Sequence, residues 1–414
     1  MSTTAADMEI LRPLAGRYSE IAHLDIQKER IDRYKRTVAL ERVRPVVLID
    51  EVPWGEIKDD ALVCRCSDPA LRGIEGRMRR TLYQWDHFQV DLVVPPVFYM
   101  GKRARSTGIG MRVEDTQIKG DTGAYIAAHE YVDQLKTEED LQKLRTPEIT
   151  YDKEGTEKAL ERASKVFDGL MPVEARGRHM SYNLWDVIAE YRGVESLLMD
   201  LAMRPDFMHA TVLRFTEIAE AQFRQYAELG LLEANSMLVH CTVACTDELP
   251  AEDFAGKVRP KDTWGRCAAQ IFDSVSPEMH DEFDLVYNQR LFGDCGMVYY
   301  GCCEAVDTKV DILRKRFKNL RKISITPWAD PETAARNIGG DFVMAAKPNP
   351  AFVASPKFDP KPVVEEMEKY LGACERHKTP CEFVIKDIST IGNKSENLTQ
   401  WAATVKGVID RYFE

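Results

Sequence analysis

The sequence lacks any uninterrupted apolar run of about 18 residues, the length that a membrane-spanning helix requires. Its first 20 residues contain no apolar stretch behind a basic start, so the pattern predicts no signal peptide. Basic charge is also scarce, because 56 Lys and Arg stand against 67 Asp and Glu, for a net charge of −11. A nucleic-acid-binding surface would be basic. These absences predict a cytoplasmic protein that binds neither membranes nor nucleic acid.

Several nucleotide and metal motifs are absent as well. No C-x-x-C pair occurs, no G-x-G-x-x-G follows the first predicted strand, and no G-x-x-x-x-G-K-[ST] is present. The ten cysteines of a cytoplasmic protein are then buried hydrophobes, metal ligands or reactive thiols rather than a disulfide framework. Only Cys241, Cys245, Cys302 and Cys303 lie close in sequence to other metal-type ligands, His240 and Glu304.

From residue 40 onward, short runs rich in β-branched residues alternate with amphipathic stretches. The predicted strands are residues 44–50, 89–95, 178–183, 235–240, 296–301, 321–326, 340–346 and 381–386. The predicted helices include 193–230, 276–293, 307–317, 330–340 and 360–377. Eight strands alternating with helices predict an α/β fold, a (β/α)₈ TIM-type barrel over residues 41–414, preceded by an N-terminal helical cap at 1–40. A doubly wound open sheet is the alternative.

Local signals support two of the helix starts and one hairpin. Ser276 and Asp330 each precede a proline and an early acidic residue, which is typical of an N-cap. The glycine-rich segment 106–123 predicts a β-hairpin over the mouth of the barrel.

Barrel enzymes carry their chemistry at the C-terminal ends of the strands. The polar, sulfur-containing and aromatic residues at these predicted ends are Asp50, Glu51, Trp54, Tyr99, Lys102, Trp185, Asp186, His240, Cys241, Cys302, Cys303, Glu304, Trp328, Lys347, Asn349, Lys386 and Asp387. Thiolate and imidazole are ligands that zinc prefers, and mixed ligands with an open position are typical of a catalytic ion. A buried structural pair remains an equal interpretation of Cys302 and Cys303, as does a hydrogen-bonded core residue for His240.

Two stretches carry a family resemblance. The segment "AAQIFDSVSPEMHDEFDLVYNQRLF" (268–292), followed by "VYYGCCE" (298–304), is similar to uroporphyrinogen decarboxylases and to the related zinc-dependent corrinoid methyltransferases. The resemblance continues through "FVIKDISTIGNKSENLTQWAATVKGVI" (383–409), which is similar to the last strand and helix of that superfamily. It extends over residues 40 to 414 and implies a TIM-type barrel.

The resemblance favours the methyltransferase branch. After the first strand the chain has the acidic "LIDEVPWGE" (48–56) where the decarboxylase has a basic motif that grips porphyrinogen carboxylates. The methyltransferases hold zinc with a His-x-Cys after the equivalent strand and a cysteine after the last one. This chain matches the first cysteine with Cys302, but has Tyr300 in place of the histidine and Asp387 near the second cysteine. His240, Cys303 and Glu304 carry groups that zinc accepts as ligands, so they would supply the ligands that are missing at these two positions.

The resemblance therefore implies metal-assisted methyl transfer between a small methylated substrate and a corrinoid (cobalamin). No Asp-x-His-x-x-Gly of a corrinoid-binding domain is present, so the corrinoid is expected on a partner protein. The alternatives are a metal-free decarboxylase or lyase and a non-catalytic binding subunit, and a homodimer is possible. The predicted zinc ligands are Cys302, Cys303, His240 and Asp387, and the predicted catalytic residues are Glu304 and Asp387. The residues predicted to contact substrate are Tyr300, Lys347, Asn349, Lys386, Trp185 and Glu51.

Overall fold

The computed structural model describes residues 5–118 and 128–413. Its strands are β1 (Val46–Ile49), β2 (Phe98–Gly101), β3 (Ala104–Ser106), β4 (Asp115–Ile118), β5 (Ala128–Tyr131), β6 (Ile149–Tyr151), β7 (Val173–Arg176), β8 (Met180–Ser181), β9 (Trp264–Cys267), β10 (Met297–Tyr300), β11 (Leu320–Ile325), β12 (Val343–Ala346) and β13 (Cys381–Ile385).

The helices are α1 (Ala5–Ala22), α2 (Asp25–Val38), α3 (Pro69–His87), α4 (Glu138–Leu141), α5 (Lys153–Phe167), α6 (Leu184–Arg192), α7 (Val194–Met203), α8 (Pro205–Glu228), α9 (Pro277–His280), α10 (Val286–Phe292), α11 (Val310–Arg316), α12 (Pro331–Ile338), α13 (Ala351–Ala354), α14 (Pro360–His377) and α15 (Glu396–Phe413). Short turns of 3₁₀ helix are η1 (Trp54–Glu56), η2 (Asp60–Leu62), η3 (Pro260–Asp262) and η4 (Gln270–Phe272), and a π-helical turn, η5 (Asp281–Leu285), joins α9 to α10.

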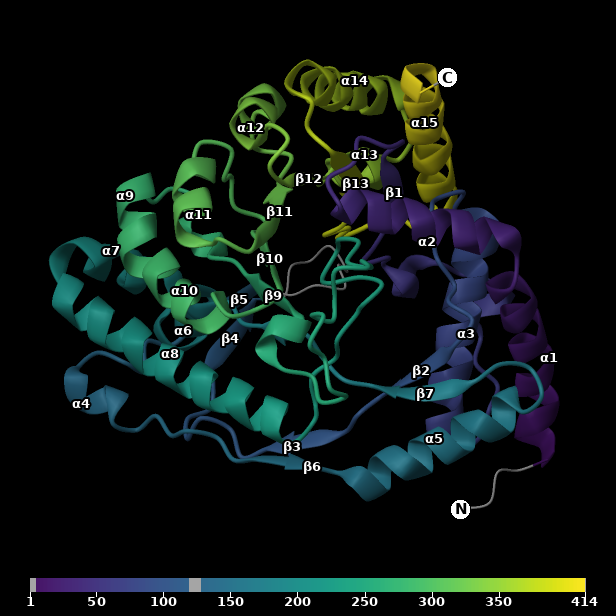
Figure 1. Ribbon diagram of the computed structural model, residues 1–414, viewed down its shortest axis with the longest axis horizontal. Helices are drawn as coiled ribbons and strands as arrows, with labels where there is room; N and C mark the ends of the chain where they lie inside the picture. Colours follow the sequence, from purple (N-terminus) through teal and green to yellow (C-terminus); the bar gives the residue numbers. More distant parts are fainter. Residues whose placement is uncertain (1–4, 119–127, 414) are drawn as a thin grey trace.

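A parallel sheet of seven strands organises the molecule. Its order is β1-β13-β12-β11-β10-β9-β8, so the first and last strands of the chain's parallel set are neighbours, and β1 and β8 are the two edges. β2 pairs in parallel with β7 in a separate two-stranded sheet. Figure 1 shows helices α8 to α12, α14 and α15 following one another around the outside of these strands. The fold is therefore α/β with a parallel sheet, and closure into an eight-stranded barrel stays a prediction.

Six of the eight predicted strands are present. The runs at 44–50, 178–183, 296–301, 321–326, 340–346 and 381–386 contain β1, β8, β10, β11, β12 and β13. The predicted strands at 89–95 and 235–240 are wrong, since neither run forms a strand. The sheet instead includes β9, which the sequence did not predict because "WGRC" has no β-branched residue.

The two wrong strands have identifiable reasons. Beside β1, the Asp91 carboxylate accepts the Val47 N–H at 2.9 Å. In a regular sheet this N–H would donate to a backbone carbonyl of a neighbouring strand. In the second run, the Val239 N–H donates to the Thr242 carbonyl at 3.0 Å, which closes a tight turn instead of extending a strand. In both cases a run rich in apolar residues does not by itself show that the segment pairs with another strand.

The predicted N-caps are confirmed. Ser276 accepts the Met279 N–H at 3.3 Å at the start of α9, and Asp330 accepts the Thr333 N–H at 2.7 Å at the start of α12. In each helix the next residue is a proline, whose missing N–H has no partner to lose at that position. These local interactions fix where the chain turns from the end of a strand into the following helix.

The two faces of the sheet bury different cores. Leu48, Trp264 and Tyr299 face one core, together with the 231–263 segment between α8 and β9, and Tyr300 on the opposite face packs against the surrounding helices. The inner core also holds an ion pair, in which Lys322 Nζ lies 2.8 Å from Glu382 Oε2. The 231–263 segment therefore lies against the inner face of the sheet, which places its residues near the strand ends.

α1 and the predicted hairpin lie at the periphery, whereas α2 contributes Tyr34 and Val38 to the core on the inner face of the sheet. α1 packs against α3 and α5 and contributes Leu11 and Ala15 to a separate apolar cluster. β4 lies inside the predicted hairpin segment 106–123 and pairs antiparallel with β5, which lies beyond that segment; residues 119–127 between them are outside the described residues. None of the helices in the described part of the chain combines the length and apolarity needed to cross a bilayer.

Candidate functional site

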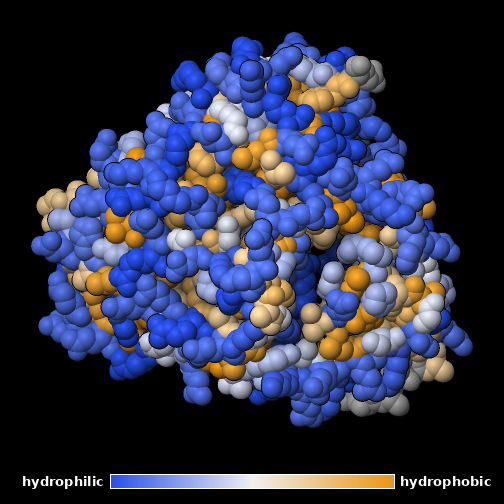
Figure 2. Space-filling model, in the orientation of Figure 1, coloured by the Kyte–Doolittle hydropathy of each residue, from blue (hydrophilic) through white to orange (hydrophobic). Residues whose placement is uncertain are grey.

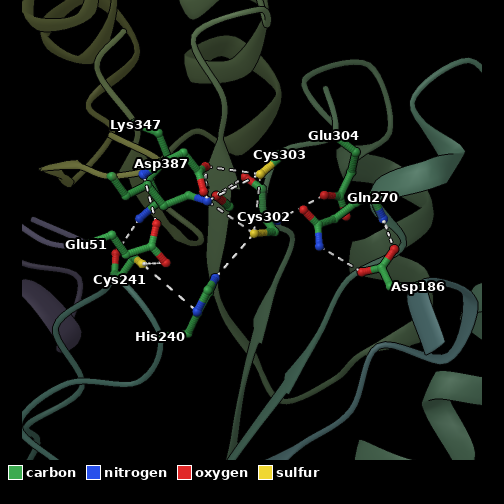
Figure 3. A network of polar contacts seen from close by, with 12 residues as sticks. Glu51, Asp186, His240, Cys241, Gln270, Cys302, Cys303, Glu304, Lys347 and Asp387 are labelled. Atoms are coloured by element: carbon green, nitrogen blue, oxygen red, sulfur yellow. Dashed lines mark hydrogen bonds and ion pairs between the residues drawn. The ribbon is translucent and has the colours of Figure 1, made fainter. Parts of the chain in front are cut away.

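Five segments converge at the C-terminal ends of the parallel strands. Residues that follow β1, β10, β12 and β13 meet the turn at 240–241 from the 231–263 segment, as Figure 3 shows. The residues brought together are Glu51, His240, Cys241, Cys302, Cys303, Lys347, Lys386 and Asp387. Parallel strands place their C-terminal ends on one edge, so residues far apart in sequence become neighbours here.

Cys302 lies at the centre of this group. Its sulfur is 3.2 Å from His240 Nε2 and 3.2 Å from Lys386 Nζ. The residue follows Gly301, whose φ of 100° is strained for any residue with a Cβ, and the Ser324 hydroxyl donates to the Cys302 carbonyl at 3.0 Å. The turn after β10 is thereby held with the Cys302 sulfur toward both partners.

Cys303 faces the exposed side of the group. Its sulfur lies 3.6 Å from Cys302 Sγ and 3.2 Å from Asp387 Oδ2, and Lys386 Nζ is 3.3 Å away. Lys386 also forms an ion pair with Asp387, whose side chain is half exposed while that of Lys386 is buried. We call Cys302, Cys303, His240, Lys386 and Asp387 the cysteine cluster. It combines thiol, imidazole, ammonium and carboxylate groups at one accessible point.

Charge within the cysteine cluster favours a single thiolate. The hydrogen bond from Cys303, with further help from His240 and Lys386, lowers the pKa of the Cys302 thiol well below its usual range. The same hydrogen bond, together with burial, raises the pKa of Cys303. Burial acts to lower the pKa of Lys386, but the charge of Cys302 and the Asp387 hydrogen bond raise it overall. Cys302 is therefore the ionised and nucleophilic sulfur, and Lys386 is its counter-ion.

A second donor set lies on the other side of the His240 ring. Ligand atoms of Glu51, His240 and Cys241 all lie within 4.8 Å of one another, and we call these three residues the His240 triad. Cys241 Sγ is 3.7 Å from Glu51 Oε1 and 4.0 Å from His240 Nδ1. Because His240 faces Cys302 with Nε2 and Cys241 with Nδ1, one metal ion cannot use both ring nitrogens.

The backbone is strained at several of these positions. Glu51, His240, Cys241 and Asp387 have φ values of 51°, 32°, 39° and 54°, in the region that residues other than glycine avoid. Each such residue costs of order 1–3 kcal/mol, and strain of this kind clusters at functional sites. Lys347 stabilises one of these turns, since its ammonium donates to the Cys241 carbonyl. Holding these side chains in place therefore lowers the stability of the fold.

Glu304 acts behind the cysteine cluster rather than within it. Its buried carboxylate accepts the Cys302 N–H at 3.0 Å and the Ala269 N–H at 3.0 Å. Burial raises the pKa of Glu304 to about 7. Nearby, Asp186 accepts the backbone and side-chain N–H groups of Gln270, and burial raises its pKa to about 6. Glu304 thus fixes the cysteine turn against the loop after β9.

Three predicted substrate residues lie elsewhere. Tyr300 is fully buried on the helix side of β10, where its hydroxyl contacts His280 Nε2 at 2.6 Å and Asp284 at 2.8 Å. Trp185 is buried in the outer core and donates to the Phe283 carbonyl. Asn349 accepts the Ala351 N–H and shapes the start of α13. Successive side chains of a strand point to opposite faces of the sheet. Because Tyr299 points to the inner face, Tyr300 points to the outer face.

Two residues of the site had no predicted role as zinc ligand, catalytic residue or substrate contact, although Cys241 was among the residues at the predicted strand ends. Cys241 directly follows His240, and that adjacency was the signal available in the sequence. Arg266 was missed because β9 was not predicted. It is 6% exposed and donates to Asn183 Oδ1 at 2.7 Å, while its Nε and Nη2 have no hydrogen-bond partner among the described residues. Its charge also helps to lower the pKa of Cys302, so Arg266 lies near the cysteine cluster.

Comparison with known proteins identifies a similar fold. No protein-family model and no curated protein matches this sequence. Among solved structures, a methyltransferase from Methanosarcina mazei is similar, with a TM-score of 0.50 and 12% sequence identity. The match covers 93% of this chain and 99% of that chain. At this identity the likeness concerns the fold, and it extends over almost the whole of both proteins.

Proposed function

We propose that this protein is a methyltransferase that moves a methyl group between a small methylated substrate and a corrinoid carried by a partner protein. The observation that carries the proposal is the thiolate-forming cysteine cluster at the C-terminal ends of the parallel strands. The likeness of the fold to a methyltransferase, over 93% of the chain, adds support. A thiolate beside an imidazole, an ammonium and a carboxylate suits transfer of a small electrophilic group.

The donor atoms of the His240 triad fit a zinc ion. Carboxylate oxygen, imidazole nitrogen and thiolate sulfur are all zinc ligands, and three of them would leave a position open for substrate. Zinc bound there would act as a Lewis acid that lowers the pKa of a substrate thiol or polarises the heteroatom that carries the methyl group. In this arrangement His240 Nε2–H donates to Cys302 and fixes the imidazole, as neighbours of metal-bound histidines do.

The remaining residues have separate roles in the proposal. Lys386 donates to Asp387 at one side of the cysteine cluster, and this ion pair can supply a proton to the heteroatom that loses its methyl group. Glu304 positions Cys302 through the backbone. Arg266, a buried guanidinium with two unpartnered nitrogens, is suited to an anionic group of the substrate. The corrinoid partner would dock over the exposed Asp387.

Zinc content tests the metal assignment. We expect near-stoichiometric zinc in protein purified without chelator, measured by inductively coupled plasma mass spectrometry, and loss of zinc in Cys241→Ser. Cys302→Ser should keep the ion, and Cys295→Ser, which changes a buried cysteine of the outer core, serves as a matched control. Zinc lost from Cys302→Ser but kept by Cys241→Ser would assign the ion to Cys302, Cys303, His240 and Asp387. A zinc-free parent protein would refute the metal proposal.

Activity tests the reaction. Cob(I)alamin and methylcobalamin differ in visible absorbance, so methyl transfer from methoxylated aromatics, methylamines, betaines or methyl thioethers can be followed directly. We expect Cys302→Ala to abolish transfer and Cys295→Ala to leave it unchanged. Full activity in Cys302→Ala would mean that Cys302 and Cys303 only pack in the core and take no part in the reaction. Release of CO₂ from a carboxylated substrate by metal-free protein would instead support a decarboxylase, and binding without turnover a non-catalytic subunit.

A further inference from the structure

A large cavity lies beside α3, separate from the cysteine cluster. It is bounded by α3, by β2 and β7, and by residues 233–238 of the 231–263 segment, and its volume is about 640 Å³. Binding sites for small molecules commonly have volumes of 300 to 1,000 Å³. Figure 2 shows the molecule hollowed beside α3, above the β2–β7 pair. No member of the cysteine cluster lines the cavity within the described ranges.

Three arginines from two segments line this cavity. Arg77 comes from α3, Arg176 ends β7, and Arg178 follows it. Arg77 lies over the Phe98 ring, with its guanidinium carbon 3.7 Å from the ring centroid, and Arg178 lies over Tyr226 at 4.7 Å. Aromatic rings hold both guanidinium groups, and Arg178 Nη1 also donates to the Tyr226 hydroxyl at 3.3 Å, so both groups are pre-organised for a ligand.

The cavity carries an excess of positive charge. Arg176 pairs with Glu233, but Arg77 and Arg178 have no carboxylate within 4.0 Å in the part of the chain that the structure describes. Burial, with a contribution from the nearby charge of Arg176, lowers the pKa of the Arg77 guanidinium. This excess occurs in a protein whose net charge is −11, so it is a local feature and does not reflect the overall composition. An anion bound in the cavity would offset this unpaired positive charge.

The rest of the cavity wall is largely apolar. Tyr18, Leu48, Tyr99 and Met237 are among the residues that line it. We propose that the cavity binds an amphiphilic organic anion, with its acidic group at Arg77 and Arg178 and its apolar body against this wall. The acidic group can be a carboxylate, a sulfonate or a phosphate, since each accepts two N–H donors of a guanidinium. This site lies outside the cysteine cluster and does not depend on methyl transfer.

A fluorescent anion provides the test. 1-Anilinonaphthalene-8-sulfonate has the proposed apolar body and acidic group, so we expect it to bind with one-to-one stoichiometry and enhanced fluorescence. Arg77→Gln and Arg178→Gln should each weaken its binding at least about tenfold, which is the loss of one charge-assisted hydrogen bond. Arg224→Gln removes the same charge from the exposed face of α8 and should leave the affinity unchanged.

Competition on the unaltered protein separates charge from apolar binding. Naphthalene-1-carboxylate should displace the probe at a concentration at least about tenfold lower than the isosteric naphthalene-1-carboxamide. Equal displacement by the carboxylate and the amide would overturn the proposal, as would unchanged probe binding in both arginine variants. Absence of one-to-one binding by the unaltered protein would also overturn it. None of these outcomes depends on zinc or on methyl-transfer activity, so the proposed function is tested separately.

Discussion

Replacing Glu304 by glutamine should flatten the dependence of stability on pH. The carboxyl is fully buried, and burial raises its pKa from the ordinary 4.5 to about 7. A raised pKa means that the folded state holds this proton more tightly than the unfolded state. Between pH 4.5 and 7 the unfolded chain is ionised at Glu304 while the folded protein is still protonated, so stability falls as the pH rises.

The magnitude follows from the two pKa values. One pKa unit corresponds to about 1.4 kcal/mol, so ionised Glu304 destabilises the fold by about 3 kcal/mol once the pH exceeds 7. Below pH 4.5 both states are protonated and the residue contributes nothing to the slope. Glutamine has no such titration, but its NH₂ group would face one of the two backbone N–H donors, at Cys302 or Ala269. That mismatch should cost about 1–3 kcal/mol at pH 5.

Urea unfolding at pH 5, 6, 7 and 8 measures the effect. The unaltered protein should lose about 2 to 3 kcal/mol more between pH 5 and 8 than Glu304→Gln does. Other buried acids titrate in both proteins, so the difference isolates Glu304. Glu366→Gln is a matched control, because burial also raises the pKa of Glu366 to about 7. Both variants should flatten the profile, but only Glu304→Gln should reduce methyl transfer. Parallel pH profiles for Glu304→Gln and the unaltered protein would refute this reasoning.

Three other substitutions have defined outcomes. Lys386→Met removes the counter-ion of Cys302, so the pH at which iodoacetamide alkylates this thiol should rise by about 1 to 3 units; an unchanged alkylation profile would contradict the pairing. Arg266→Gln should raise KM about 10- to 100-fold for a methyl donor that bears a carboxylate and leave KM for a neutral donor unchanged. Lys322→Met leaves buried Glu382 without its ion-pair partner and should lower the free energy of unfolding by about 3–5 kcal/mol, with recovery in the double variant that also carries Glu382→Leu.

Much of the α/β pattern was predictable because its signals are local. The runs rich in apolar and β-branched residues that became β1 and β13 are buried on both faces, as parallel strands are. Ser276 and Asp330 cap their helices with their own side chains, so each helix start needs only a few neighbouring residues. Where the partner lies far away in sequence, as for Asp91 beside β1, the same apolar pattern predicted a strand that does not exist.

The position of Cys302 at the end of a strand was also predictable from the neighbouring residues. The sequence predicted a strand ending at Gly301, and in the structure β10 ends at Tyr300, with Cys302 following after Gly301. Substrate contact was predicted for Tyr300 from its position in the motif, whereas the alternation of side chains along β10 directs this residue toward the helices.

The sequence by itself determined that the chain alternates strands and helices and that sulfur and acidic groups follow the strands. Only the tertiary structure decided which of them meet. It placed the 240–241 turn on the inner face of the sheet, where His240 bridges Cys302 and Cys241 through its two ring nitrogens. It also set Lys386 against both cysteines of the pair, 84 and 83 residues away in sequence. Such contacts depend on strand order and on backbone turns held at unfavourable φ values by the surrounding packing, and no local pattern of residues records either.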